Sequence, residues 1–387
     1  MTKQKVKLLA IILGFILAGV LLFANKKDPC INDHTLKCWK ASVENTFDKE
    51  GLVPALDLVE YYYKEAPGFA ENCHNFGHLL GEMTYELFEK GEEFEVSPKT
   101  AFCSYGFYHG YMEVLVAKRG DATEAREFCH YVDERLGNKT PDASLQCFHG
   151  IGHGWVNAHD RPNTWGDDIA MSEPALELCR DVATNDIELS RCATGVFNGI
   201  AIFYSTGEYE LTMSKTDPLL LCKRQTDPIF EDACYLSMNI ALMQLTQGDF
   251  LRAARYIEEI RDPVMADHAI LNLAIMLGSG DSLTTEDVVE TCRQVKTELQ
   301  TPCIQGFAFS FLEHGEPGRE YVEALAVCED GALSESEREG CFSYLFGYLA
   351  QWYSKEKALG ICATYDKENQ DFCTTQVENT LKGLGKF

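Results

Sequence analysis

The sequence predicts an all-helical protein made of stacked helical hairpins, each closed by a disulfide. Two observations predict this fold. Sixteen cysteines are spread along the 387 residues, and most fall into pairs around a short polar stretch. The second cysteine of several pairs also opens a recurring glycine-containing phrase, and an interval of 30 to 45 residues between copies is typical of helix–turn–helix repeats. With 45% hydrophobic and 24% charged residues, the chain has the composition of a folded protein.

From Cys129 onward the cysteines pair by spacing. The first cysteine of each pair ends a helical pattern, as in Ala125–Cys129, and the second begins the next helix. A disulfide that closes a loop of about 15 residues stabilises a hairpin by roughly 3 kcal/mol in the chain-entropy model. The spacing does not determine how Cys30, Cys38, Cys73 and Cys103 pair. The predicted disulfides are Cys129 with Cys147, Cys179 with Cys192, Cys222 with Cys234, Cys292 with Cys303, Cys328 with Cys341 and Cys362 with Cys373.

The phrase that opens the second helix recurs along the chain. It reads CSYGFYHG at Cys103, CFHGIGHG at Cys147 and CATGVFNG at Cys192, with a variant, CHNFGHLLG, at Cys73. Glycines four residues apart lower helix propensity, so they indicate positions where two helices approach closely. A long step before Cys303 predicts a cysteine-free repeat unit further along the chain, around Asp262–Gly278. The array can remain an open α-solenoid or close into an α/α toroid, and the sequence leaves both alternatives open.

These hairpins resemble the disulfide-bridged Sel1-like relatives of tetratricopeptide repeats, in which one cysteine ends a helix and a second cysteine with a glycine opens the next. The segment Gly248–Ala274 is also similar to a tetratricopeptide unit. The resemblance covers about residues 120–380 and concerns layout only, because the loops are longer and the histidines of the phrase are foreign to that family. It implies a stacked-hairpin fold and a tendency to bind proteins or peptides in the groove of the array, and it carries over no catalytic residue.

The N-terminal segment has the features of a membrane-targeting sequence. Three lysines precede an apolar run from Leu8 to Ala24. This pattern predicts a signal-anchor helix within residues 1–27 that spans the membrane once, with a cleaved signal peptide as the alternative. The leading lysines stay in the cytoplasm. Both alternatives place residues 28–387 outside the cytoplasm, in a periplasmic or extracellular compartment that would oxidise the cysteines.

The remaining chain divides by composition into a histidine-rich array, residues 28–212, and a helical scaffold, residues 213–387. The 60 acidic and 34 basic residues give a net charge of −26. A surface this acidic repels phosphate backbones and anionic lipids, which excludes nucleic acid as a partner. It is compatible with cationic or metal ligands.

Histidines concentrate in the recurring phrases. Eight of the ten lie between His34 and His159. Histidines four residues apart share one face of a helix, and Glu82 and Glu113 each follow a histidine by the same spacing. If the phrases open equivalent helices, these side chains converge from neighbouring repeats on one surface and offer nitrogen and oxygen ligands to zinc, iron, copper or manganese. The predicted metal ligands are His74, His78, His109, His149 and His153.

Two other interpretations compete with the metal site. His109, His153 and Asn198 occupy the same slot of the phrase, so a polar side chain repeated by duplication can simply form packing hydrogen bonds. Helical toroids that cleave acidic polysaccharides also combine His, Tyr and Asn, which makes Tyr108 and Asn198 candidate catalytic residues by analogy. The HExxH motif of zinc proteases, phosphate loops and nucleophile elbows are all missing from the sequence.

Three functions therefore stand as hypotheses. The first is a metal-dependent enzyme or metal carrier, with Glu82 and Glu113 as acids or additional ligands. The second is a non-catalytic scaffold that binds a protein or peptide partner. The third is a polysaccharide-processing toroid that works without a metal. The sequence does not decide whether the protein is an enzyme.

Overall fold

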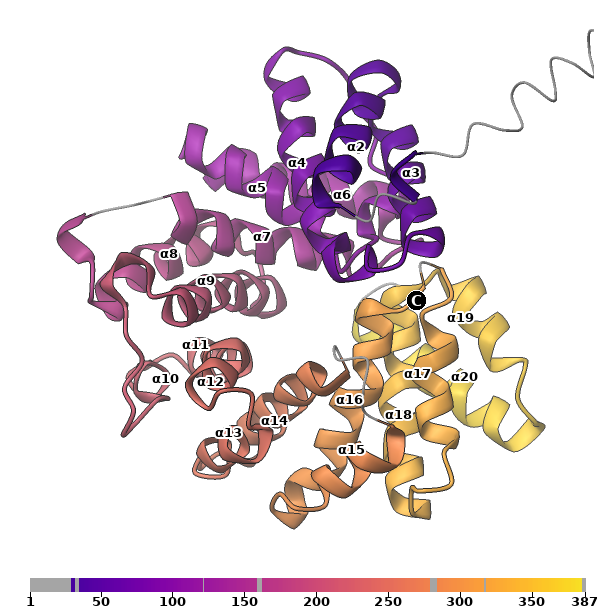
Figure 1. The fold of residues 1–387 in the computed structure, drawn as a ribbon. Coiled ribbons are helices and arrows are strands. Elements are labelled where there is room, and N and C mark those ends of the chain that lie inside the picture. Colours follow the sequence, from indigo (N-terminus) through magenta and orange to yellow (C-terminus); the bar gives the residue numbers. More distant parts are fainter. Residues whose placement is uncertain are drawn as a thin grey trace, which may run out of the picture. The chain divides into compact units, whose positions relative to one another are not determined.

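The computed structural model describes residues 29–31, 35–120, 122–158, 162–278, 284–316 and 318–384 (Figure 1). These residues form α-helices and short 3-10 helices, and the described ranges contain no strand. The prediction of an all-helical protein is confirmed. The chain divides into two compact units, of which the first ends at Asn72 and the second begins at Cys73.

The first unit is a helical pair with a small aromatic core. Its elements are η1 (Pro29–Ile31), α2 (Leu36–Glu50), α3 (Leu52–Glu65) and η2 (Ala70–Asn72). Thr35 caps α2 by accepting a hydrogen bond from the backbone N–H of Cys38, which satisfies one of the free donors at the helix start. Trp39 donates its indole N–H to the carbonyl of Cys30 at 3.0 Å and packs edge-on against Phe69.

The predicted membrane helix, residues 1–27, lies outside the described residues. Within the described part of the chain, no helix is long and apolar enough to cross a membrane. All sixteen cysteines form disulfides, eight in number. Because disulfides persist in oxidising compartments, they suggest an extracytoplasmic environment.

The second unit is a succession of helical hairpins (Figure 1). Its α-helices are α4 (Cys73–Glu89), α5 (Gly106–Arg119), α6 (Ala122–Leu136), α7 (Ala143–Ala158), α8 (Asp168–Val182), α9 (Asp186–Thr206), α10 (Leu220–Lys223), α11 (Pro228–Ser237), α12 (Asn239–Leu245), α13 (Phe250–Ile257), α14 (Pro263–Gly278), α15 (Thr285–Cys292), α16 (Gln300–His314), α17 (Tyr321–Glu329), α18 (Glu335–Trp352), α19 (Lys355–Cys362) and α20 (Lys367–Gly383).

The disulfides follow the hairpins. All six pairs predicted from spacing are confirmed, and each joins a helix or the turn after it to the helix that follows. The four cysteines that spacing left open pair as Cys30 with Cys38 and Cys73 with Cys103. The predicted cysteine-free unit is also present, because α14 packs on α13 without a disulfide between them.

Neighbouring repeats pack mainly through the helices that begin with the phrase. Helix α5 contacts α4 on one side and α7 on the other, and α7 contacts α9. The phrase glycines make this approach possible. A Cβ atom on Gly110 would overlap the carbonyl oxygen of His78, and one on Gly195 would overlap the carbonyl oxygen of His149. Phe107, a buried phrase aromatic, contributes to the core between these helices.

Residues far apart in the sequence of the second unit are neighbours. Ser104 donates its hydroxyl to the carbonyl of Glu313 at 2.6 Å. The backbone N–H of Asp142 donates to the carbonyl of Gln351 at 3.0 Å, and Tyr105 packs edge-on against the ring of Trp352. The segments before α5 and α7 therefore contact the ends of α16 and α18.

Candidate metal centre

Five imidazole rings from three successive repeats lie together in the second unit. Helix α4 supplies two of them, α5 supplies one and α7 supplies two. The ring of His109 lies at the middle of the cluster. Its centroid is 5.2 Å from those of His74 and His78, 4.9 Å from that of His149 and 5.5 Å from that of His153. The i,i+4 spacing and the glycine-mediated packing of α4, α5 and α7 together produce this cluster.

Three of the histidines have nitrogen atoms close enough to share one ion. One ring nitrogen each from His74, His78 and His109 lies within 4.8 Å of the other two. The Nε2 atoms of His74 and His78 are 3.1 Å apart. With metal–nitrogen bonds of about 2.05 Å, two ligands at this separation subtend roughly 100° at the metal, between octahedral and tetrahedral values. A His74/His78/His109 triad therefore has a geometry that can hold a metal ion.

Hydrogen bonds at Nδ1 determine which nitrogen is available in two of the rings. His74 Nδ1 lies 3.0 Å from the carbonyl oxygen of Cys103. His149 Nδ1 lies 3.0 Å from Thr194 Oγ1, and that hydroxyl donates its own proton to the carbonyl of Arg191. Both acceptors require a proton on Nδ1, so Nε2 keeps the lone pair in each ring. This arrangement is typical of the outer contacts that orient metal-binding histidines.

Glu113 orients two further rings from the turn of α5 that follows His109. Its Oε1 lies 2.9 Å from His153 Nδ1, and its Oε2 lies 3.7 Å from His78 Nδ1. Asn157 donates a hydrogen bond to the same Oε1 at 2.9 Å. Burial alone would raise the pKa of the Glu113 carboxyl, but hydrogen bonds from His153 and His78 hold this pKa well below its ordinary value. Glu113 is therefore a carboxylate that can accept the Nδ1 proton of His153 and that faces Nδ1 of His78.

The central ring carries a polar atom that the described part of the chain leaves without a partner. His109 Nε2 is buried and has no hydrogen bond there. A buried polar atom without a partner costs free energy, and a metal ion would compensate for that cost. Burial, followed by the neighbouring rings, lowers the pKa of His109 well below its ordinary value. The pKa of His74 falls to about 4 for the same reasons. Both rings are neutral at pH 7, which is the form that binds metals.

One side of the cluster is open to solvent. The side chains of His78 and Glu113 are 21% and 22% exposed, whereas that of His153 is 6% exposed. A small molecule or an exchanging ion therefore has access from the side of His78 and Glu113.

The other candidate residues differ in how deeply they are buried. Glu82 is exposed on α4 and Asn198 is half-buried on α9. Tyr108 is fully buried, and its hydroxyl shares a hydrogen bond with Thr100 at 2.8 Å. Burial raises the pKa of that phenol. This environment favours a structural role for Tyr108.

Sequence reasoning missed the residues that orient the rings. Asn157 follows His153 by four residues, so helical spacing was a readable signal for it. Thr194 occupies the slot in its phrase that His149 occupies in the preceding one. The carbonyl of Cys103 had no sequence signal, because its position depends on how the backbone turns into α5. His34 and His159 lie outside the described residues.

The comparisons with known proteins supply no family. No family model, no curated protein and no solved structure matches the chain. The resemblance to Sel1-like repeats is therefore one of layout, an all-helical array of disulfide-bonded hairpins.

Proposed function

We propose that the protein is an extracytoplasmic metal-binding protein whose five-histidine cluster holds a divalent transition metal, as the centre of a metal-dependent enzyme or of a metal carrier. The observation that carries this proposal is the 3.1 Å separation of His74 Nε2 and His78 Nε2, together with the buried Nε2 of His109, which has no hydrogen bond to any described residue. Packing histidines would be expected to satisfy their ring nitrogens within the chain. Here one ring nitrogen from each of three histidines on two helices lies within 4.8 Å of the other two.

The contacts of His78 suit both a metal-free and a metal-bound state. Since His74 Nε2 carries a lone pair, His78 Nε2 donates a proton to it when no ion is present. A metal ion requires the lone pair of His78 Nε2 instead, so the proton belongs on His78 Nδ1. That atom faces Glu113 Oε2 at 3.7 Å. Glu113 is thus placed to stabilise the tautomer that binds the ion.

The donor set limits which metals fit. Every cysteine is in a disulfide, so no thiolate is available in the described residues. Imidazole nitrogens suit zinc, iron and copper, whereas calcium and magnesium prefer oxygen. His74, His78 and His109 would hold the ion, and the rings of His149 and His153 lie with their centroids 4.9 and 5.5 Å from that of His109. When bound, such an ion can polarise a carbonyl or phosphoryl oxygen or lower the pKa of water.

We further propose that the repeats are Sel1-like and that residues 1–27 contain an N-terminal signal-anchor. We also propose that the groove of the array binds a protein or peptide partner. The hydrogen bonds of Ser104 with Glu313 and of Asp142 with Gln351 support the closed, toroidal alternative, because they join early and late repeats of the second unit.

The decisive test is metal analysis of protein purified without a histidine tag. We expect elemental analysis, or titration with Zn²⁺, Co²⁺ and Cu²⁺, to give one tightly bound ion per chain. His78→Gln should abolish tight binding. The matched control is His268→Gln, since His268 lies outside the cluster and pairs with Asp232 at 2.9 Å. A wild-type protein that is metal-free and takes up none of these ions rules the proposal out.

A further inference from the structure

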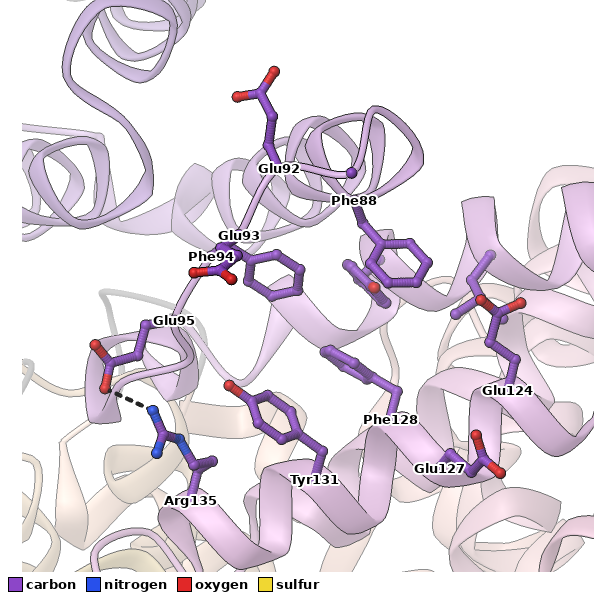
Figure 2. Close-up of a pocket in the computed structure, with 13 residues that line it drawn as sticks. Phe88, Glu92, Glu93, Phe94, Glu95, Glu124, Glu127, Phe128, Tyr131 and Arg135 are labelled. Atoms are coloured by element: carbon purple, nitrogen blue, oxygen red, sulfur yellow. Dashed lines mark hydrogen bonds and ion pairs between the residues drawn. The ribbon is translucent and has the colours of Figure 1, made fainter.

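A second site lies on the outer side of the same repeats. A cavity of about 820 Å³ opens between the end of α4, the segment that follows it, α5 and α6 (Figure 2). This volume is within the range of small-molecule pockets. Its walls are rich in aromatic rings, and none of the five histidines lines it. The aromatic residues are Phe88, Phe94, Tyr111, Phe128 and Tyr131.

The rings form a continuous and well-supported wall. Tyr111, which is buried, stacks on Phe128 with centroids 4.2 Å apart and planes 15° apart. Phe94 packs against both of these rings, at 5.7 and 6.2 Å. Phe88 is 37% exposed, and the centroid of its ring lies 6.4 Å from that of Tyr111. Figure 2 shows the rings of Phe88, Phe94, Phe128 and Tyr131 around one hollow.

The rim of the hollow is strongly acidic. Five carboxylates and one guanidinium line it. The guanidinium, Arg135, is bound to Glu95 at 3.2 Å, and Glu124 lies 3.7 Å from Arg119. The lining therefore keeps an excess of negative charge over an aromatic surface. The carboxylates are those of Glu92, Glu93, Glu95, Glu124 and Glu127.

We propose that this pocket binds a small organic ammonium cation with a hydrophobic body. Aromatic faces attract cations through their quadrupole, by about 0.5–2 kcal/mol per contact depending on desolvation. The protein already uses this wall in that way, since the guanidinium of Arg135 lies 5.8 Å from the centroid of Tyr131. The carboxylates add long-range attraction for a cation and repel an anion. A neutral apolar ligand would contact the aromatic rings, but the carboxylates of the rim would not attract it.

The pocket is independent of the metal proposal. Its rings and carboxylates come from the end of α4, the segment 91–95, α5 and α6, and its lining includes none of the five histidines. Loss of metal binding in a histidine variant therefore leaves the pocket intact. Failure of either proposal can be recognised without reference to the other.

Calorimetric titration of the full-length protein with benzyltrimethylammonium tests the assignment. We expect this cation to bind more tightly than the uncharged benzyl alcohol, and phenylacetate not to bind. Affinity for the cation should fall as salt concentration rises. Phe88→Leu, which removes an exposed ring, should weaken binding roughly three- to tenfold. Glu93→Gln/Glu124→Gln should weaken it to a similar extent and reduce the salt dependence.

The control is Glu259→Gln/Glu290→Gln, which removes two exposed carboxylates from the C-terminal half of the array and should bind the cation like the wild type. Three results would overturn the proposal. The first is no binding of benzyltrimethylammonium to the wild type. The second is equal binding of the alcohol and the cation, or unchanged affinity in both pocket variants. The third is binding of a trilysine peptide without binding of the small cation, which would assign the groove to a peptide.

Discussion

The carboxylate of Glu113 on α5 lies 2.9 Å from Nδ1 of His153 on α7. The contact joins two successive repeats at the point where their imidazoles converge. The same carboxylate approaches His78 of the preceding repeat at 3.7 Å. One side chain thus faces rings of both neighbouring helices, at hydrogen-bond distance from Nδ1 of His153 and further from Nδ1 of His78. Outer contacts of this kind commonly change metal affinity by about 10- to 100-fold.

Replacing this carboxylate tests its role. We expect Glu113→Gln to weaken metal binding by about one to two orders of magnitude, because a neutral amide is a poorer acceptor for two imidazole N–H groups. Competition with a chromophoric chelator would measure the effect. Glu259→Gln, an exposed change far along the chain, is the control and should retain wild-type affinity. Equal affinity in both variants would remove Glu113 from the metal site.

The disulfides and the histidine spacing could be predicted because both are local properties of the chain. The partners of Cys179 and Cys192 are 13 residues apart within one hairpin. Helical periodicity alone places His149 and His153 on one face. The pairing of Cys73 with Cys103 was not readable, because the connecting segment is longer and leaves the hairpin pattern.

The orienting contacts and the aromatic pocket could not be predicted for a related reason. The carbonyl of Cys103 reaches His74 only after α4 and α5 have packed. The pocket assembles Phe88, Phe94 and Phe128 from two helices and the segment between α4 and α5. No single period in the sequence relates these positions. Such sites depend on the relative placement of neighbouring elements, which a pattern within one element does not encode.

Two glycine substitutions should have opposite effects on stability. Gly110 lies in α5 against the carbonyl of His78, and a Cβ there would force the two backbones apart. We expect Gly110→Ala to lower the free energy of unfolding by about 1–3 kcal/mol and to weaken metal binding. Gly360 lies exposed in α19 with open space around it, so Gly360→Ala should raise stability by about 0.5–1 kcal/mol.

Urea unfolding monitored by circular dichroism measures both glycine changes. The two variants add the same methyl group to a helix, so the comparison isolates the effect of the neighbouring backbone. A Gly110→Ala protein as stable as the wild type, with unchanged metal affinity, would show that α4 and α5 do not need this close approach.

The metal-free protein should lose stability as the pH falls below neutrality. Burial, followed by the nearby His78, lowers the pKa of His74 from 6.5 to about 4. Between these values the unfolded chain binds more protons at this residue than the folded one, so acid favours unfolding. The stabilising contribution is present above pH 6.5 and is lost as the pH falls toward 4. His109 and His149, whose pKa values burial also lowers, act in the same direction.

Two variants separate this effect from general acid denaturation. His74→Gln should make the loss of unfolding free energy between pH 7 and pH 5 smaller. His268→Gln should make it larger, because the hydrogen bond with Asp232 raises the pKa of His268 and stabilises the fold in acid. Chelator-treated protein unfolded with urea at each pH provides the measurement. Identical pH profiles for wild type and His74→Gln would contradict the assignment of a buried, neutral His74.

Removing a disulfide next to the site should differ from removing one far from it. The Cys179–Cys192 pair closes 13 residues and the Cys362–Cys373 pair closes 11, so each double alanine variant should lose about 3 kcal/mol of unfolding free energy in the chain-entropy model. Only the first should also weaken metal binding.

Thr194 follows Cys192 by two residues and holds the ring of His149 through its hydroxyl. When the start of α9 is no longer tied to α8, that hydroxyl is less firmly positioned. Urea unfolding and chelator competition on the same two proteins would show the difference. An equal loss of metal affinity in both variants would mean that the site responds to overall stability and not to the anchoring of α9.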